Sequence, residues 1–365
     1  MVSRRRATIG VLGIAISLVV AACGAGETSG DDRTITLRVG AGHGVGGITY
    51  STWMDGFFVP ELEKRVAEET EYTIDTRKAF GGSIAQTDEV LHAVDTGVLD
   101  IAGMCYCFFP SELFLHSIDY FVPFSSPDPV LALEAFREVF DEVPYMTEVL
   151  EDEYNQRLLG LYTVSSYELL TQFPIDSIES LQGHTVTAAG ANLPWFPEAA
   201  GVTGVQGALP EWYTGLQTGV YEAALMFPES TVGFKLFEVA DYYTLIGFGA
   251  SPQGGVHINQ DTFNELPEEV QDIVVEVGEE FEQRVAQQVA KEREAAMDTM
   301  REAGTKITTL DPEARAEWAN ALPEIPKLQL QEAESRGLES AREVFETYIE
   351  AQEERGYDFP RDWEL

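Results

Sequence analysis

The alternation of apolar and polar positions predicts a chain built from alternating strands and helices. Short apolar or alternating runs predict strands at residues 34–39, 72–76, 99–104, 157–163 and 167–173. Apolar residues at helical spacing predict helices at residues 52–69, 83–96, 129–143 and 145–156. The run at 99–104 does not alternate, which is typical of a strand buried in a parallel sheet. This order of elements indicates an α/β fold with a largely parallel sheet.

The last third of the chain reads as helical. An acidic, periodic segment begins after Leu266 and continues to Gly304. A helix of that length would measure about 55 Å at 1.5 Å per residue. Such a helix is too long for one small lobe, so we expect it to bridge two, with Gly278 as a candidate kink or break. Further amphipathic helices are expected at residues 312–319 and 325–354.

A short internal repeat supports two similar lobes. The segment 96–102 begins Thr-Gly-Val and is echoed at 218–224. In each copy a glycine that can adopt the left-handed conformation ends a predicted helix, and an apolar strand follows. Two such units more than a hundred residues apart favour a two-lobe arrangement, although Thr-Gly-Val is common enough to recur by chance.

The first 22 residues predict an export signal outside the fold. Three arginines at positions 4–6 precede an apolar run that ends at Ala22, too short for a comfortable membrane span. Small residues before Cys23 resemble a bacterial lipoprotein signal. We therefore expect residues 1–22 to be removed, Cys23 to be lipid-modified and residues 23–33 to form a flexible tether. An ordinary signal peptide with an incidental cysteine is the alternative, and a weak twin-arginine pattern leaves the export route open.

Composition narrows the function classes. The 365 residues include 62 acidic and 23 basic side chains, a formal net charge of −39, with 44% hydrophobic residues. That apolar content argues for a folded core. The charge argues against nucleic acid as a partner and against docking of the folded body on anionic lipid.

Cys105 and Cys107 are the only cysteines besides Cys23. A disulfide between them would close a strained small ring, so free thiols are favoured and a disulfide remains the alternative. No histidine has suitable spacing to complete a metal site with them, and we expect neither a metal nor a cofactor.

The strongest enzyme-like signal is the glycine-rich segment 42–47, which follows a predicted strand. It partly matches a dinucleotide-binding fingerprint, but the delay before the next helix and the export signal argue against one. His43, within this segment, is the histidine most expected to face a ligand. A secreted or lipid-anchored enzyme and a sensory ligand-binding module are kept as alternatives.

Several segments in sequence order resemble one family. They are Phe80-Gly81-Gly82-Ser83, residues 89–94, residues 96–102, Ser180-Leu181-Gln182-Gly183, residues 211–219, residues 234–240 and residues 266–271. Together they are similar to the solute-binding proteins of tripartite ATP-independent periplasmic (TRAP) transporters, the DctP-like family. The resemblance implies a two-lobe periplasmic-binding-protein-like fold with hinge strands and a long helix bridging both lobes. It also implies no catalysis, a small-molecule solute and membrane-embedded TRAP subunits as partners.

The sequence departs from that family at one position. The family usually carries an arginine a few residues after the Leu-x-Gly segment, where it pairs with a substrate carboxylate. Thr187 stands there, and no arginine occurs between Arg157 and Arg284. A carboxylate would then depend on Arg77 or Lys78, on neutral side chains, or on a helix N-terminus; otherwise the solute is neutral, cationic or aromatic.

Aromatic residues are frequent where the predicted strands end, as in many ligand pockets. The candidate ligand-binding residues are His43, Arg77, Lys78, Phe80, Tyr106, Tyr162, Tyr167, Thr187, Asn192, Trp195, Phe196, Trp212 and Phe227.

These observations predict an extracytoplasmic receptor, monomeric and lipid-anchored in the periplasm or at the outer face of the cell membrane. It would capture an organic acid or an aromatic compound in an interlobe cleft. We expect residues 34–160 with about 249–285 to form the first lobe. Residues 161–248 with about 286–365 would form the second, including the C-terminal helices.

Overall fold

Two β-sheets organise the part of the chain described by this computed structural model, residues 33–197 and 200–365. Cys23 and the predicted signal and tether lie outside these residues, except for Arg33. Residues 34–365 form one compact unit. We call the sheet of the first lobe sheet A and that of the second lobe sheet B.

Sheet A has the strand order β2-β1-β3-β10-β4. Its strands are β1 (Thr34–Ala41), β2 (Thr73–Ala79), β3 (Ile101–Cys105), β4 (Gln156–Val164) and β10 (Ser251–Asn259). β1 is parallel to β2 and β3, and β10 runs antiparallel between β3 and β4. The largely parallel sheet predicted from sequence is thus interrupted by one antiparallel strand, β10.

Sheet B has the strand order β11-β9-β5-β8-β6-β7. Its strands are β5 (Glu168–Thr171), β6 (Thr185–Ala188), β7 (Thr203–Gln206), β8 (Ala223–Met226), β9 (Tyr242–Leu245) and β11 (Lys306–Thr309). β6 is parallel to β7 and β8, whereas β5 is antiparallel to β8 and β9. β11 is parallel to β9.

The chain crosses between the sheets through two short segments that lie side by side. β4 continues through residues 165–167 into β5, and β9 returns through residues 246–250 into β10. Tyr167 N donates to Gly249 O at 3.1 Å, and Gly249 N donates to Ser166 Oγ at 3.2 Å. These paired segments are the predicted hinge strands.

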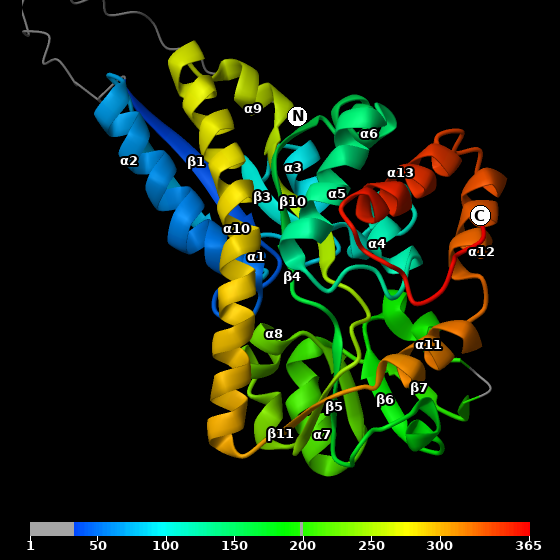
Figure 1. The fold of residues 1–365 in the computed structure, drawn as a ribbon. Coiled ribbons are helices and arrows are strands. Elements are labelled where there is room, and N and C mark those ends of the chain that lie inside the picture. The colour runs from blue at the N-terminus through cyan, green and yellow to red at the C-terminus, as the bar shows by residue number, and fades with distance from the viewer. Residues whose placement is uncertain (1–32, 198–199) are drawn as a thin grey trace, which may run out of the picture. The chain divides into compact units, whose positions relative to one another are not determined.

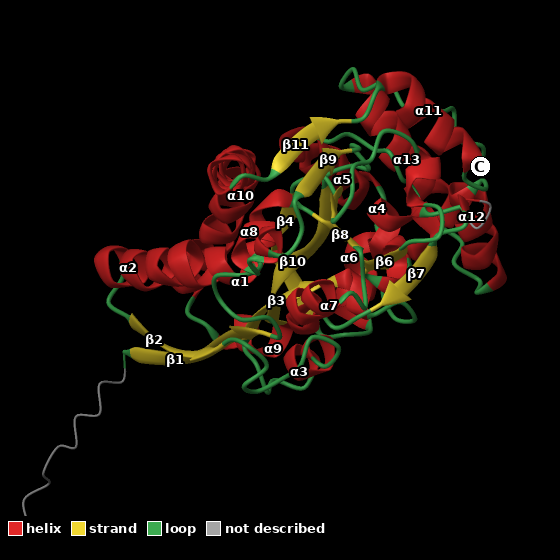
Figure 2. Cartoon of the chain, turned by 90° about the horizontal axis from the view of Figure 1, so that it is seen from below, coloured by secondary structure: helices red, strands yellow, loops and turns green. Residues whose placement is uncertain are grey.

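The helices surround both sheets (Figures 1 and 2). They are α1 (Thr49–Trp53), α2 (Val59–Glu69), α3 (Val90–Asp95), α4 (Ile118–Phe121), α5 (Pro129–Glu142), α6 (Tyr145–Asp152), α7 (Trp212–Thr218), α8 (Pro228–Gly233), α9 (Gln260–Glu265), α10 (Glu268–Ala303), α11 (Pro312–Ala321), α12 (Ile325–Ser335) and α13 (Ala341–Glu354). The N-terminus of α5 shows how local sequence determines where a helix begins. Asp128 Oδ1 accepts from Val130 N at 2.9 Å, and Pro129 occupies the first turn, where no N–H is needed.

Helix α10 bridges the two lobes, as predicted (Figure 1). It packs on β4, α5 and α2, and further along on α8 and β11. The helix does not break at Gly278, because it is continuous from Glu268 to Ala303. Gly278 instead permits close backbone contact with β4: a Cβ there would lie 2.3 Å from Leu159 O, and one on Gly160 would lie 2.3 Å from Gly278 O.

The two Thr-Gly-Val copies occupy equivalent places in different sheets. Gly97 follows α3 with φ 66° and Gly219 ends α7 with φ 74°, both in the left-handed region. Strand β3 of sheet A follows the first copy, and β8 of sheet B follows the second. The repeat thus marks one helix-to-strand turn in each lobe.

Helices α12 and α13 pack on each other and on α4, and α13 also packs on α5. α5 covers β4 and β10 of sheet A. The residue boundaries of the lobes remain a prediction. By these contacts α12 and α13 pack on helices of the first lobe, whereas the prediction assigned them to the second. No helix in residues 33–197 or 200–365 is both long and apolar enough to cross a bilayer.

Candidate ligand-binding site

The candidate site lies where facing edges of the two sheets meet. In sheet A the carboxyl ends of β1, β2, β3 and β4 share one edge with the start of β10. In sheet B the carboxyl ends of β6 and β8 share an edge with the start of β5. The hinge segments join these two edges, so the loops that follow the strands come together there. Ligands of open α/β sheets bind at such strand ends.

Four aromatic side chains form the centre of this region, and we call them the interlobe cluster: Tyr120, Tyr167, Trp195 and Phe227. The Tyr167 ring centroid lies 5.8 Å from that of Trp195 and 5.4 Å from that of Phe227, both edge-on. Trp195 Nε1 donates to Tyr120 O at 3.1 Å, which ties the second lobe to the first. All four side chains are buried. They offer the apolar surface that small-molecule sites commonly present.

A hydroxyl network runs through the cluster. Tyr120 Oη donates to Gln253 Oε1 at 2.8 Å and lies 3.4 Å from Tyr167 Oη. Gln253 belongs to β10, so the network connects both sheets' edges. Burial raises the pKa of both tyrosines far above neutrality, so each hydroxyl remains a hydrogen-bond donor.

Two buried neutral side chains of the second lobe have no hydrogen-bond partner. Asn192 and Thr187 are both 0% exposed, and Asn192 Oδ1, Asn192 Nδ2 and Thr187 Oγ1 are all unpaired. Asn192 lies three residues before Trp195 in the 3-10 helix Gly190–Trp195, where residues i and i+3 share a face. An unpaired buried amide costs about 1–3 kcal/mol, so a bound solute that pairs with it would recover that cost.

Three buried carboxyls flank the hinge segments. Glu168 accepts from Ile246 N and, at 2.7 Å, from Gly247 N. Glu229 Oε1 accepts from Ser165 N at 2.9 Å, and Asp119 Oδ2 accepts from Ser251 Oγ. Burial raises the pKa of each of these three carboxyls to about 7. Glu229 Oε2 and Asp119 Oδ1 have no partner.

His43 lies at the sheet A edge with other rings. Its Nδ1 is 2.8 Å from Tyr50 Oη, and its ring packs against Phe108. Tyr50 in turn lies 4.8 Å, centroid to centroid, from Tyr162. Burial lowers the pKa of His43 to about 4, so the imidazole is neutral at physiological pH.

The two expected first-lobe bases do not join the cluster. Arg77 pairs with Asp75 at 2.6 Å and its side chain is 69% exposed. Lys78 Nζ donates to Asp55 Oδ1 at 2.7 Å. Both cations belong to β2, the edge strand of sheet A, and each is paired with a carboxylate.

The remaining candidates have other surroundings. Tyr106 is fully buried, with its hydroxyl 3.1 Å from His257 Nε2. Phe196 packs on Phe248 and Trp318 behind the cluster. Trp212 Nε1 donates to Gly207 O at 3.0 Å, beside the outer strand of sheet B. Phe80 follows β2 and is half-buried.

Cys105 and Cys107 are joined by a disulfide at the end of β3, where free thiols were the favoured expectation. The tight turn Tyr106–Phe108 after the strand brings the two Cα atoms to 5.3 Å. Among residues 33–197 and 200–365 there is no group of three His, Cys, Asp or Glu that could hold a metal ion.

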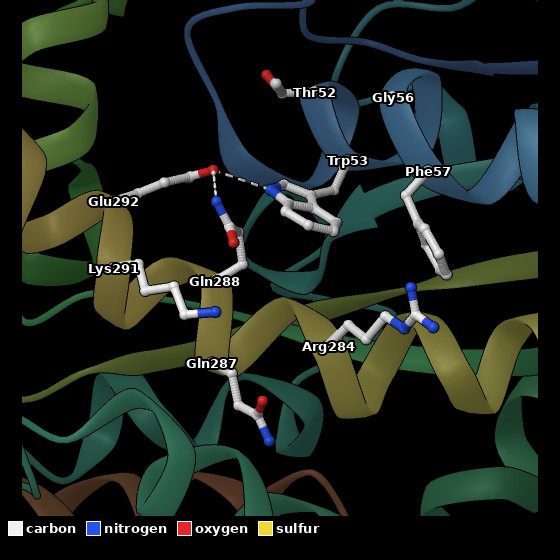
Figure 3. Close-up of a pocket in the computed structure, with 9 residues that line it drawn as sticks. All are labelled: Thr52, Trp53, Gly56, Phe57, Arg284, Gln287, Gln288, Lys291 and Glu292. Carbon is white, nitrogen blue, oxygen red and sulfur yellow. Dashed lines mark hydrogen bonds between the residues drawn. The ribbon is translucent and has the colours of Figure 1, made fainter.

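A separate surface pocket lies between α1, the π-helical segment Met54–Phe58 and α10 (Figure 3). It has a volume of about 500 Å³ and is lined by Thr52, Trp53, Gly56, Phe57, Arg284, Gln287, Gln288, Lys291 and Glu292. Trp53 Nε1 donates to Glu292 Oε1 at 3.1 Å, and the Arg284 guanidinium lies 4.9 Å from the Phe57 ring centroid. None of the predicted site residues lines this pocket.

Sequence reasoning missed Tyr120, Gln253, Asp119 and Glu229. Tyr120 and Asp119 lie in the short helix α4, and Gln253 lies in β10, far from the segments that resemble the family. Glu229 stands two residues after Phe227, in the first turn of α8, and this closeness to a predicted site residue was the one available signal.

Comparison with known proteins places the chain among solute-binding proteins. The sequence profile of DctP, bacterial extracellular solute-binding protein family 7, matches residues 51–332. Solute-binding protein NAS141_03721 of Sulfitobacter sp. is 30% identical over 141 residues, which cover 36% of this chain and 41% of that relative. The ectoine-binding periplasmic protein TeaA of Halomonas elongata is 22% identical over 258 residues, 69% of this chain and 73% of TeaA.

Solved structures share the fold at low sequence identity. DctP7, a Bordetella pertussis extracytoplasmic solute receptor binding pyroglutamic acid, has a TM-score of 0.72 at 19% identity, covering 86% of this chain and 99% of that one. A marine metagenome TRAP solute-binding protein specific for aromatic acid ligands has a TM-score of 0.74 at 18% identity, covering 88% and 100%. A Sulfitobacter TRAP protein with bound β-D-galacturonate has a TM-score of 0.70 at 18% identity, covering 87% and 100%.

Proposed function

This chain belongs to family 7 of the bacterial extracellular solute-binding proteins, the DctP family, and we propose that it captures one small organic solute between its lobes and delivers it to TRAP membrane subunits. The family assignment rests on residues 51–332, which include every strand of both sheets except β1. The proposed mode of action is binding without turnover.

The observation that carries the proposal is the interlobe cluster with its unpaired neutral groups. Trp195 and Phe227 supply apolar walls, and Asn192 and Thr187 supply hydrogen-bonding atoms with no partner in the protein. A solute enclosed there would bury its apolar surface and satisfy these atoms at once. The relatives with pyroglutamate, galacturonate or aromatic acids named as ligands support a small organic compound as the solute class.

Closure of the lobes is part of the proposal. Ser230 Oγ donates to Gly47 O at 2.7 Å, joining α8 of the second lobe to the glycine-rich loop after β1. The hinge segments lie at the same edges. We infer that lobe opening breaks the Ser230–Gly47 contact and that a bound solute favours the closed form.

The cellular location and oligomeric state that we propose are those expected from the sequence. We infer an extracytoplasmic, monomeric protein that is anchored through lipid on Cys23 after removal of residues 1–22. The family's extracellular placement supports the compartment. We also retain the proposed division into lobes at residues 34–160 with 249–285 and residues 161–248 with 286–365, except for α12 and α13, which pack on α4 and α5 of the first lobe.

A thermal-shift screen over organic acids, aromatic acids, amines and osmolytes tests the proposal. A solute that binds only the native state raises the melting temperature in proportion to the logarithm of its concentration above Kd. Calorimetry should then give one site per chain, and the solute should be recovered unchanged after prolonged incubation. Chemical conversion of the solute would contradict a receptor role.

A further inference from the structure

The surface pocket between α1, the π-helical segment and α10, which we call the α10 pocket, has walls that are held by contacts within the protein (Figure 3). Trp53 Nε1 donates to Glu292 Oε1 at 3.1 Å, and Gln288 Nε2 donates to the same oxygen at 3.3 Å. Thr52 Oγ1, on the α1 side, accepts from Gly46 N at 2.9 Å. The lining is therefore positioned before any ligand arrives.

Two aromatic rings give this pocket an apolar wall. Trp53 and Phe57 belong to α1 and the π-helical segment, and their ring centroids lie 6.0 Å apart. Both rings are only partly buried, unlike those of the interlobe cluster. π-Helical turns are rare and are frequently found at functional sites. The volume of about 500 Å³ lies within the range of small-molecule sites.

Cationic groups outnumber acidic ones in the lining of the pocket, which is the reverse of the chain as a whole. Arg284 and Lys291 line it together with one acid, Glu292, whereas the chain has 62 acidic and 23 basic side chains. The two cations stand two helical turns apart on α10, so they share one face with about 10.5 Å between them along the axis. Figure 3 shows both on the α10 side of the pocket, across from the two rings.

The hydrogen-bonding groups left unused in this pocket are donors. In the part of the chain that the structure describes, the Lys291 ammonium has neither a hydrogen bond nor an ion pair. Arg284 donates to Glu280 through one nitrogen and lies 4.9 Å from the Phe57 ring centroid, which leaves further N–H groups available. Glu292 already accepts two hydrogen bonds through Oε1. Unused cationic donors beside aromatic surface are complementary to a carboxylate on an aromatic skeleton.

We propose that the α10 pocket is a second ligand-binding site, separate from the interlobe cluster, and that it takes a small aromatic carboxylate. The carboxylate of the ligand pairs with Lys291 and Arg284, and its ring lies against Trp53 and Phe57. This site goes beyond the proposed receptor function, because none of its residues belongs to the interlobe cluster.

Fluorine NMR of protein labelled with fluorotryptophan tests the proposal, because two of the five tryptophans report on the two sites separately. Trp53 lines the α10 pocket, and Trp195 belongs to the interlobe cluster. The variants Trp53→Phe and Trp195→Phe assign the two resonances. The probes are hydrocinnamate and phenylpropanol, which share a phenylpropyl skeleton and differ in the carboxylate.

We expect hydrocinnamate to shift the Trp53 resonance to saturation, and phenylpropanol to require a concentration at least about tenfold higher for the same shift. Added NaCl should weaken the binding of hydrocinnamate, because the cations are accessible to solvent. A Trp53 resonance that does not respond to millimolar hydrocinnamate, or that responds equally to the alcohol, overturns the proposal. A response at Trp195 alone also overturns it, but leaves the receptor function standing.

A matched pair of variants tests the role of the unpaired cation. Lys291→Gln removes the charge from the pocket, and we expect the affinity for hydrocinnamate, measured at the Trp53 resonance, to fall about two- to fivefold, as for a solvent-exposed ion pair. Lys327→Gln makes the same substitution in α12, where Lys327 pairs with Glu364 at 3.0 Å, and should leave the affinity unchanged. Equal affinity in Lys291→Gln and the unmodified protein would overturn the pairing of the carboxylate with Lys291.

Discussion

Glu168 shows how a single side chain stabilises the passage between the lobes. It opens β5, and its carboxyl accepts the N–H groups of Ile246 and Gly247 from the returning segment. Arg315 donates to the carbonyls of those same two residues from the other side. The second crossing segment is therefore held through both its donors and its acceptors.

Replacing Glu168 with glutamine should change how stability depends on pH. Burial raises the pKa of Glu168 from 4.5 to about 7, so between these values the folded protein retains a proton that the unfolded chain has released. Folding stability from this group thus falls as pH rises through that window. Glutamine has no proton to lose. The free energy of unfolding of Glu168→Gln, relative to the unmodified protein, should rise by up to about 1.4 kcal/mol per pH unit.

Urea denaturation of both proteins at pH 5 and pH 7 measures this difference. The buried Asp119 and Glu229, and His43, His116 and His257 with lowered pKa values, titrate in both proteins and cancel in the comparison. A difference that stays constant between the two pH values would show that Glu168 titrates normally.

Truncating the aromatic wall should weaken solute binding. Phe227→Ala removes a buried ring that packs edge-on against Tyr167, and we expect a loss of at least about 1 kcal/mol in binding free energy. Trp195→Ala should cost at least as much, because the indole also donates to Tyr120 O. Phe173→Ala, which removes a ring stacked on His184 elsewhere in sheet B, is the control. Full affinity in both cluster variants would exclude the cluster as the binding site.

At the scale of elements, the sequence predicted β1 to β5, the strand after the second Thr-Gly-Val copy and the long helix, but not β6, β7, β9, β10 or β11. The hydrophobic runs were clear because each strand or helix buries a continuous face. The predicted helix at 52–69 was partly wrong, since a π-helical turn interrupts it at Met54–Phe58. Pro60 has no N–H to donate to Gly56 O, and the helix widens there. From sequence, a proline at this position is equally typical of the first turn of a helix. It indicates a π-helical turn only when the residues before it are known to be helical.

Alanine substitutions at Gly278, which lies in the contact between α10 and β4, and at Gly56 should have opposite effects on stability. A methyl group at Gly278 would lie 2.3 Å from Leu159 O, so Gly278→Ala should lower the free energy of unfolding by about 1–3 kcal/mol. A methyl group at Gly56, in the π-helical segment, would have no other atom within 4 Å. Gly56→Ala should therefore be neutral or stabilising by up to about 1 kcal/mol. Denaturant midpoints decide this, and a stable Gly278→Ala protein would mean that α10 can move away from the sheet.

At the scale of the whole molecule, the fold and family could be predicted, but the site only in part. Trp195 and Phe227 stood out because they are large aromatic residues of the kind that line ligand pockets. Asp119 and Glu229 did not, because 62 acidic residues share the chain and burial depends on contacts between distant segments. Arg77 and Lys78 were expected at the cluster because their strand ends there, but partner carboxylates hold them elsewhere.

Membrane attachment is a prediction about the complete chain. Cys23→Ser should move the protein from the membrane fraction to the soluble fraction, because it removes the only residue proposed to carry lipid. Cell fractionation and immunoblotting measure the distribution, and Cys105→Ser provides a control for loss of a cysteine that lies within the fold. Continued membrane association of Cys23→Ser would exclude lipid on this residue as the anchor.

The tight Gly278 contact also makes α10 a lever with a fixed fulcrum. The helix is continuous on either side of Gly278, and about 25 residues separate this point from the last turn, a lever arm of about 37 Å. A rotation of about 10° at the fulcrum would displace the far end by about 6 Å, where the helix is followed by β11 of the second lobe. A small change of angle at the first lobe would therefore become a translation of several ångströms at the far edge of sheet B.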